Sequence, residues 1–373
     1  MTESNNANQI GVHPRPALGR LPKYAAGKPP VAVAGLESFK LSSNENPLGP
    51  VPGVEEVIRA ASGVHRYPDP TSTLLREALG SFLDVPAEDI VTGAGSLGAL
   101  NQILAAFAGQ NDDGGQDEVV YAWRSFEAYP ICVGLAGAKS VQVPVGRDGR
   151  HDLAAMAAAV TNNTRIVLLC TPNNPTGPAL RSQETRDFIA GLPGHVVVVV
   201  DEAYQEFVRM DDPVDGVELY REYPNVIVLR TFSKAHGLAG LRVGYSISRP
   251  EITAHLRAAA TPFAVSNIAE LAAVASVRCN DEVVERVQSL VDERDRVVAG
   301  LREAAWDIPD AQGNFVWLPL GADAQDFAAL AGSQGLSVRA FDGEGVRVSI
   351  GEVEANSRFL EICMAYTNEP RRS

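Results

Sequence analysis

Unbroken runs of valine, isoleucine and leucine constrain the fold of this chain more than any other feature. The clearest is "HVVVVVD", in which residues 196–200 are all valine and lead directly into Asp201. Similar runs occur in "DIVTG", "DEVVYAW", "RIVLLC" and "NVIVL". Strands that are apolar on both faces are typical of a sheet covered by helices on both sides, not of a sheet with one face in water.

Segments with helical periodicity separate these runs. The segments "STLLREALGSFL", "SLGALNQILAAFA" and "ETRDFIAGL" repeat apolar residues every three or four positions. Helices that alternate with strands imply right-handed crossovers and a mostly parallel sheet. We therefore predict an α/β fold, with a large domain over residues 39–263 that carries this sheet.

The chain changes character after about residue 263. A long helical tract, "NIAELAAVASVRCNDEVVERVQSLVDERDRVVAGLREA", leads into the short strands "NFVWLPL", "LSVRAF" and "GVRVSIG". We predict a smaller α+β domain over residues 264–373. Residues 1–38 are polar and then rich in proline and glycine, and they are predicted to form a disordered tip followed by an arm. A length of 373 residues fits two domains better than one.

Composition narrows the class of function. The net charge is −14, and an acidic chain repels phosphate backbones, so a nucleic-acid partner is disfavoured. The four cysteines are scattered, without the spacing of a zinc site or a disulfide framework. No apolar signal core opens the sequence, and the longest aliphatic run is too short to span a membrane. These features favour a cytoplasmic enzyme, with no nucleic-acid, membrane or metal partner.

Ligands of open α/β sheets bind beyond the carboxyl ends of the strands, and four motifs fall there. The first is "VTGAGSLG", in which Gly93, Gly95 and Gly98 match the pattern G-x-G-x-x-G. A nicotinamide-binding domain also needs an acid at the end of the next strand, and no acid closes "VVYAW". Two interpretations remain: helix amides that hold one phosphate group, or only a tight strand-to-helix turn.

The second and third motifs supply an amide and a carboxylate. In "CTPNNPTGP" the prolines stiffen the loop and would aim Asn173 or Asn174 at a fixed point. In "VVVVVDEAYQEF" Asp201 ends a buried strand, where a carboxylate is unfavourable unless it meets a cation or a donor. A helix cap by Asp201 is the alternative interpretation. Tyr204 follows three residues later.

The fourth motif is "RTFSKAHGLAGLRVGY". Lys234 follows the strand "NVIVL", and a lysine at a sheet edge can form a Schiff base with an aldehyde. Gly237 and Gly240 would permit close approach of the backbone. The side chains that can bind a phosphate are Thr231, Ser233 and Arg242. A solvated surface charge is the alternative interpretation of the lysine.

One ligand satisfies all four motifs. It carries a phosphate for the helix amides, hydroxyls and Arg242, and an aldehyde for Lys234. It also carries a ring nitrogen for Asp201 and a phenolic oxygen for Asn174 and Tyr204. These groups describe pyridoxal 5′-phosphate, whose ring is an electron sink when a carboxylate keeps its nitrogen protonated. We predict this cofactor.

The order of "PNNPTG", "DEAY" and "SKAHGLAGLRVGY" resembles the fold-type I pyridoxal-phosphate aminotransferases, and within them the histidinol-phosphate aminotransferase family. The segments "SSNENPLGP", "RYPDP" and "GVRVSIG" match that family too. The resemblance covers about residues 20–365. It implies a fold-type I transferase and a homodimer whose active sites are shared between subunits.

The resemblance implies a role for each matching residue at the cofactor. Lys234 would be the Schiff-base lysine and would carry the proton between the substrate Cα and the cofactor C4′. Asp201 would pair with the pyridinium nitrogen, Asn174 and Tyr204 would hydrogen-bond the phenolic oxygen, and Phe126 would stack on the ring. The residues expected at the phosphate are Gly95, Ser96, Thr231, Ser233, Arg242 and, from the neighbouring subunit, Tyr67.

The resemblance also implies a substrate-binding set. Arg347 would grip the substrate α-carboxylate, in the bidentate geometry that arginine favours. A surface ion pair is the alternative for this residue. The residues expected at the substrate are Arg347, Arg339, Asn44, Tyr24 and Phe263.

Three departures from the family pattern bear on the substrate. Phe126 in "RSFEAY" and Phe263 in "PFAVSN" stand where tyrosine is usual. Losing these hydroxyls should weaken phosphate binding, since a buried hydrogen bond to a charged group contributes roughly 1.5–3 kcal/mol. The third departure is His236, interpreted as a packing residue. Arg339 argues the other way, because the family uses an arginine there for the substrate phosphate, although it could instead meet 2-oxoglutarate.

Several of these segments look closer to the actinobacterial aromatic, or phenylalanine, aminotransferases. We therefore predict transamination of phenylalanine and tyrosine, with tryptophan as a further candidate and 2-oxoglutarate or glutamate as the amino partner. Histidinol-phosphate transamination in histidine biosynthesis is the first alternative, and a pyridoxal-phosphate-dependent decarboxylase of the same fold is the second. A cofactor-binding regulatory domain lacks support, because the sequence has no DNA-binding helix pair or basic extension.

Overall fold

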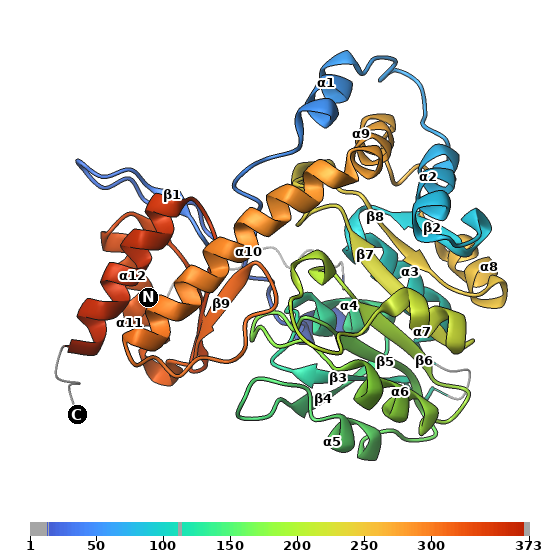
Figure 1. The fold of residues 1–373 in the computed structure, drawn as a ribbon. Helices are drawn as coiled ribbons and strands as arrows, with labels where there is room; N and C mark the ends of the chain where they lie inside the picture. Colours follow the sequence, from blue (N-terminus) through green and yellow to red (C-terminus); the bar gives the residue numbers. More distant parts are fainter. Residues whose placement is uncertain (1–12, 14, 111–113, 369–373) are drawn as a thin grey trace, which may run out of the picture.

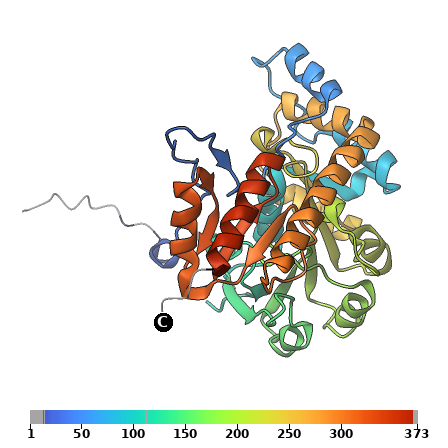
Figure 2. The same ribbon diagram turned by 60° about the vertical axis from the view of Figure 1, so that its left-hand side comes forward.

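The computed structural model describes residues 13, 15–110 and 114–368, so most of the predicted N-terminal tip lies outside the described residues. Two units make up the described chain. A large unit is built on a seven-stranded sheet and a small unit on a three-stranded sheet. Helix α10 (Asn280–Glu303) extends from the large unit along the small one, as Figure 1 and Figure 2 show.

The large sheet confirms the predicted mostly parallel α/β fold. Only β8 runs antiparallel to both of its neighbours, β2 and β7, and the other neighbouring pairs are parallel. The strands, in spatial order, are β2 (Ile90–Gly93), β8 (Gly244–Ile247), β7 (Val226–Thr231), β6 (Val197–Asp201), β5 (Thr164–Cys170), β3 (Glu118–Trp123) and β4 (Lys139–Pro144).

Strand β6 explains why its apolar run is continuous. All five of its residues are buried. Val198 and Val200 belong to the hydrophobic core on one side of the sheet, and Val197 and Val199 to the core on the other side. The first side is covered by α5 (Leu153–Ala158), α6 (Ser182–Ala190) and α7 (Gly216–Glu222). The second side is covered by α3 (Gly95–Phe107), α4 (Ala128–Ala136) and α8 (Pro250–Ala259).

The predicted helical tract after residue 263 forms two helices. Helix α9 (Asn267–Arg278) ends at Cys279, and α10 begins at the next residue. Helix α9 packs against α1 (Pro52–Ala60) and α2 (Thr73–Leu83) of the large unit, whereas α10 packs on α12 (Val353–Asn368) of the small unit. The exact domain bounds therefore remain a prediction.

The small unit is α+β, as predicted. Its antiparallel sheet has the order β11 (Arg339–Phe341), β12 (Gly345–Ser349), β9 (Phe315–Leu318), and α11 (Ala324–Ser333) packs on it. The predicted strand "LSVRAF" is two strands, because β10 (Leu336–Ser337) stops before β11 and pairs elsewhere. Its parallel partner is β1 (Phe39–Lys40), which comes from the other end of the chain and lies beside the small unit in Figure 1.

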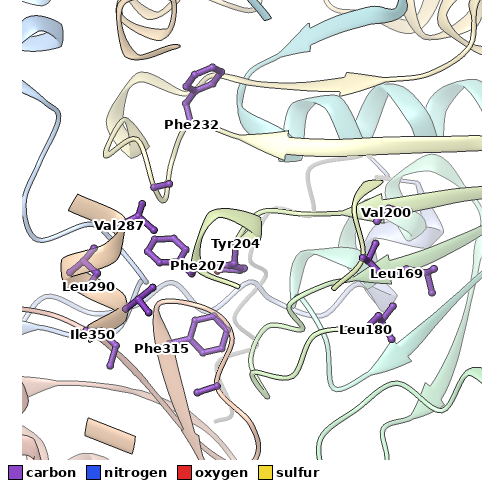
Figure 3. Close-up of a cluster of buried hydrophobic side chains, with 14 of the residues drawn as sticks. Leu169, Leu180, Val200, Tyr204, Phe207, Phe232, Val287, Leu290, Phe315 and Ile350 are labelled. Atoms are coloured by element: carbon purple, nitrogen blue, oxygen red, sulfur yellow. The ribbon is translucent and has the colours of Figure 1, made fainter. Parts of the chain in front are cut away.

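Buried apolar side chains join the two units, as Figure 3 shows. Val200 comes from β6, Leu290 from α10 and Phe315 from β9. Tyr204 lies between them, and its ring meets the Phe315 ring edge-on with centroids 5.1 Å apart. The loop after β6 is therefore held against the small unit by core packing.

The described ranges lack two kinds of feature. No helix there is both long and apolar enough to cross a membrane. The same residues contain no group of three or more histidine, cysteine, aspartate or glutamate side chains arranged to hold a metal ion.

Candidate active site

A cavity lies where β5, β6 and β7 end, and the β11–β12 hairpin of the small unit contributes to its wall. It brings together motifs that are distant in the sequence. The predicted site residues that line it are Tyr24, Ser96, Phe126, Asn174, Asp201, Tyr204, Thr231, Ser233, Lys234, Arg242, Arg339 and Arg347.

Lys234 follows β7 and extends its amine into the cavity. Its Nζ donates to the backbone oxygens of Ser43 and Asn44, at 3.0 and 3.1 Å. Desolvation, with the positive charge of Arg347 nearby, lowers the pKa of Lys234 to about 7. Much of this amine is therefore unprotonated near neutral pH, which is the form that attacks an aldehyde.

Asp201 ends β6, and its two carboxylate oxygens differ in their contacts within the described chain. Its Oδ2 accepts from the Tyr129 hydroxyl at 2.7 Å. Its Oδ1 is buried and has no hydrogen-bond partner among the described residues. Burial raises the pKa of Asp201 to about 6. Tyr204, not Asp201, occupies the N-cap position of the next helical turn, so the helix-cap interpretation of Asp201 is wrong. An unpaired buried oxygen of this kind suits a ring N–H donor.

The predicted phosphate-binding groups gather at the N-terminus of α3. The Thr231 hydroxyl donates to Ser233 Oγ at 3.0 Å. A Cβ atom built on Gly95, whose φ is +74°, would lie 2.5 Å from Arg242 Nη2. Helix amides, two hydroxyls and a guanidinium thus surround one end of the cavity, beside Ser96. This arrangement favours the phosphate interpretation of the glycine-rich turn.

Of the two asparagines in "CTPNNPTGP", only the second lines the cavity. Asn173 is held within its own loop, since its Nδ2 donates to Thr176 Oγ1 at 2.7 Å. Asn174 Oδ1 accepts from Arg347 Nη1 at 2.6 Å. The prediction that either asparagine is aimed at the site is thereby narrowed to Asn174.

Arg347 is buried on β12 and makes contacts with neutral groups. Besides Asn174, its Nη2 donates to the backbone oxygen of Ser42 at 2.8 Å. Its Nε is buried without a hydrogen-bond partner in the described part of the chain. The alternative interpretation, a surface ion pair, does not match a residue that is 8% exposed. Asn44 contacts Tyr204, which is predicted to bind the cofactor. The Asn44 Nδ2 donates to the Tyr204 hydroxyl at 3.0 Å.

Residues 37–371 match the model of the family described as aminotransferase class I and II. The chain belongs to this family. The aromatic amino acid aminotransferase of Streptomyces avermitilis is 51% identical to this aminotransferase, over 95% of this chain and 98% of its own length. The enzyme of the same name from Thermobifida fusca is 50% identical over 96% and 98%.

Solved structures agree with the family. Histidinol-phosphate aminotransferase from Sinorhizobium meliloti, in complex with pyridoxal-5′-phosphate, superposes on this aminotransferase with a TM-score of 0.78. The two are 29% identical, and the match covers 88% of this chain and 90% of that one. The predicted fold-type I architecture and aminotransferase family are confirmed.

Four predicted residues are not among the described residues that line the cavity of the single chain: Gly95, Asn44, Tyr67 and Phe263. Tyr67 and Phe263 stack on one another, with ring centroids 4.7 Å apart. Their side chains are exposed, Tyr67 to 83% and Phe263 to 41%. The expected contact of Tyr67 with a neighbouring subunit and of Phe263 with the substrate remain predictions.

The glycines after Lys234 differ in what they do. Gly237 has φ +69°, and a Cβ there would lie 2.7 Å from the Gly49 carbonyl oxygen, so close backbone approach is real at this position. A Cβ on Gly240 would meet nothing within 4 Å in the described chain, so close approach of the backbone at Gly240 stays a prediction. A close approach that the sequence did not predict occurs at Gly244 of β8. A Cβ there would lie 2.4 Å from the Ser96 amide nitrogen.

His236 packs beneath the lysine loop of the aminotransferase. Its ring lies 4.6 Å from that of Phe232, and its Nδ1 lies 2.8 Å from Ser276 Oγ. Burial lowers the pKa of His236 to about 4, so the ring is neutral at physiological pH. These contacts agree with its interpretation as a packing residue.

Sequence reasoning missed two functional candidates in the segment "WRSFEAY". Tyr129 binds Asp201, and Glu127 lines the cavity and pairs with Arg339. A signal was available for Tyr129, because it lies three residues after Phe126, the spacing of one helical turn. No local signal identifies Glu127, because its partner is 212 residues away in the sequence.

Proposed function

We propose that this aminotransferase transfers the amino group of phenylalanine and tyrosine, with tryptophan as a further candidate, to 2-oxoglutarate. The observation that carries the substrate class is the near-complete match to relatives that are named aromatic amino acid aminotransferase and are about half identical to this chain. The cavity supports the reaction type for two reasons. It holds Lys234, whose pKa is lowered to about 7, and Asp201 Oδ1, which is buried without a hydrogen-bond partner in the described chain.

The residues of the cavity fit pyridoxal phosphate as the cofactor. When bound, this group supplies an aldehyde and a ring that accepts the electron pair released at the substrate Cα. Asp201 Oδ1 would hold the proton on the ring nitrogen, and Arg242 with Thr231 and Ser233 would bind the phosphate. Lys234 Nζ would provide the covalent attachment and take the proton that leaves the substrate Cα.

Arg347 and two phenylalanines that line the cavity would bind the substrate. The guanidinium of Arg347 would bind the α-carboxylate, since its present contacts with Asn174 and Ser42 leave its charge without an acidic partner. Phe126 and Phe341 line the same cavity and offer apolar surface to an aromatic ring.

Histidinol phosphate is the second candidate substrate. The specific observation in its favour is Arg339, which lines the cavity and could meet a substrate phosphate. The likeness to the Sinorhizobium meliloti enzyme points the same way. We rank it second because Arg339 already has an acidic partner in Glu127.

We further propose a cytoplasmic homodimer. The exposed stack of Tyr67 and Phe263 is the surface that a second subunit would cover. The four cysteines are free, as is usual in a reducing compartment.

A comparison of two amino donors tests the proposed function. We expect kcat/KM with 2-oxoglutarate to be at least ~10-fold higher for phenylalanine than for histidinol phosphate. The reason is that Arg339, the residue that could meet the substrate phosphate, is neutralised by Glu127. Lys234→Ala should abolish turnover of both donors. Lys139→Ala is the matched control. Lys139 lies on the edge strand β4 and pairs with Glu118 of β3. A strong preference for the phosphate ester would contradict the substrate proposal, and no turnover with any amino acid would contradict transamination itself.

A further inference from the structure

An ion pair between the large and the small unit lines the cavity. Arg339 Nη2 donates to both carboxylate oxygens of Glu127, at 2.8 and 2.7 Å. The side chains are 15% and 23% exposed, and both line the cavity together with Phe126 and Phe341. The Arg339 guanidinium also lies over the Phe341 ring, 4.9 Å from its centroid.

The two arginines that the β11–β12 hairpin contributes to the cavity therefore differ in available charge. Arg347 contacts a side-chain amide oxygen and a backbone oxygen, which do not neutralise it. Arg339 is held against a carboxylate. Glu45, another acidic side chain that lines the cavity, pairs with Lys40 at 2.9 Å. Within the described residues, the hairpin thus offers one arginine without an acidic partner, which is enough for one carboxylate.

We propose that Glu127 is a positioning residue that sets side-chain specificity by neutralising Arg339. This inference rests on the proposed function. With the pair closed, the charges of Arg339 and Glu127 cancel where the ring enters, and a partly buried guanidinium without a partner would be unfavourable beside apolar atoms. A distal carboxylate or phosphate binds only by displacing Glu127 from Arg339, and so binds less tightly than Arg339 alone would allow.

A second ion pair at the same contact provides a matched control. Arg124 Nε donates to Glu344 Oε2 at 2.7 Å and joins the same loop, after β3, to the same β11–β12 hairpin. Neither residue lines the cavity in the described chain. Glu344→Gln therefore removes the same charge from the same contact between units without touching the pocket.

Binding of two non-reactive ligands to the cofactor-loaded dimer tests the proposal. Glutarate carries a distal carboxylate, and 3-phenylpropanoate carries a ring. For Glu127→Gln we expect the dissociation constant of glutarate to fall about tenfold and that of 3-phenylpropanoate to change by less than about threefold, because one charge-assisted contact is released. Calorimetry measures both, and Glu344→Gln should change neither.

Steady-state kinetics supply a second readout. In Glu127→Gln the ratio of kcat/KM for phenylalanine to that for histidinol phosphate should fall about tenfold, through KM of the phosphate ester more than through kcat. In an Arg339→Gln background the Glu127→Gln change should have no effect on this ratio. Equal changes for both ligands, or an effect that persists without Arg339, would overturn the proposal.

The test remains decisive if Glu127→Gln does not fold. Arg339→Gln alone should then weaken glutarate more than 3-phenylpropanoate, and an equal loss overturns the proposal. Failure of the proposed function is separate, because wild type would then prefer histidinol phosphate as the amino donor. The binding of glutarate and 3-phenylpropanoate reports on the ion pair whichever donor is preferred.

Discussion

At the scale of single residues, Asp201 trades fold stability for function. Its pKa is about 6 in the fold because of burial, against 3.8 for an ordinary aspartate. The stability that the protonated group confers is present below about pH 4 and is lost as the pH rises through 6. Above that pH the cofactor-free fold holds a buried carboxylate at a cost of about 3 kcal/mol at most. A cationic ring nitrogen would offset this cost.

We therefore predict opposite effects of Asp201→Asn on stability and on cofactor binding. At pH 8 the cofactor-free variant should unfold at higher denaturant concentration than wild type, because no buried charge remains and Tyr129 can still donate to the amide oxygen. At pH 4 this gain should be largely absent. Pyridoxal phosphate should bind the variant more weakly. Denaturant unfolding at both pH values, with and without cofactor, measures this, and an equal loss of stability at both would contradict it.

At the scale of elements, β8 positions the N-terminus of α3. Gly244 lets the strand lie directly against the Ser96 amide, which belongs to the predicted phosphate site. We predict that Gly244→Ala raises the dissociation constant of pyridoxal phosphate at least ~10-fold, since a methyl group would push the helix end away from its anion. Gly240→Ala, in the same stretch of the chain, is the control. The added Cβ would meet nothing within 4 Å in the described chain. Fluorescence titration of the cofactor-free protein measures both, and equal affinities would refute the role of β8.

The elements also explain what could be predicted from the sequence. Strands β5, β6 and β7 were predicted because burial on both faces demands an unbroken apolar run. Strand β8 was missed because "GYSI" is short and carries a glycine and a serine. Strand β4 was missed because it lies at an edge and is largely accessible. The predicted helical tract has no proline or glycine beside Cys279. The break between α9 and α10 at this residue therefore had no local signal in the sequence.

The candidate site follows the same rule. Asp201 comes directly after an apolar run, Lys234 and Asn174 follow such a run by a few residues, and strand ends of one sheet converge on one edge. Tyr129 and Glu127 act through partners that come from other elements. Such contacts depend on how the units pack, and the sequence pattern carries no information about that.

At the scale of the whole molecule, the proposed sharing of sites between two subunits predicts complementation between variants. The purified chain should elute at twice its mass of 39.7 kDa. Tyr67→Ala and Lys234→Ala should each lower activity, because one removes a cofactor contact across the interface and the other the reactive amine. After the two variants are mixed and exchanged, about a quarter of the sites should combine an intact Lys234 with an intact Tyr67. Turnover measured before and after exchange checks this, and no recovery would contradict a shared site.

The pairing of β1 with β10 sets the order in which the enzyme can be completed during its synthesis. Residues 39–40 leave the ribosome early, yet their partner strand lies at residues 336–337. Arg347 of the substrate wall and Ser349, which binds Asn44, are made later still. A nascent chain can form its central sheet long before it has a closed pocket. The last tenth of the polypeptide therefore decides when a ribosome-bound chain becomes an enzyme.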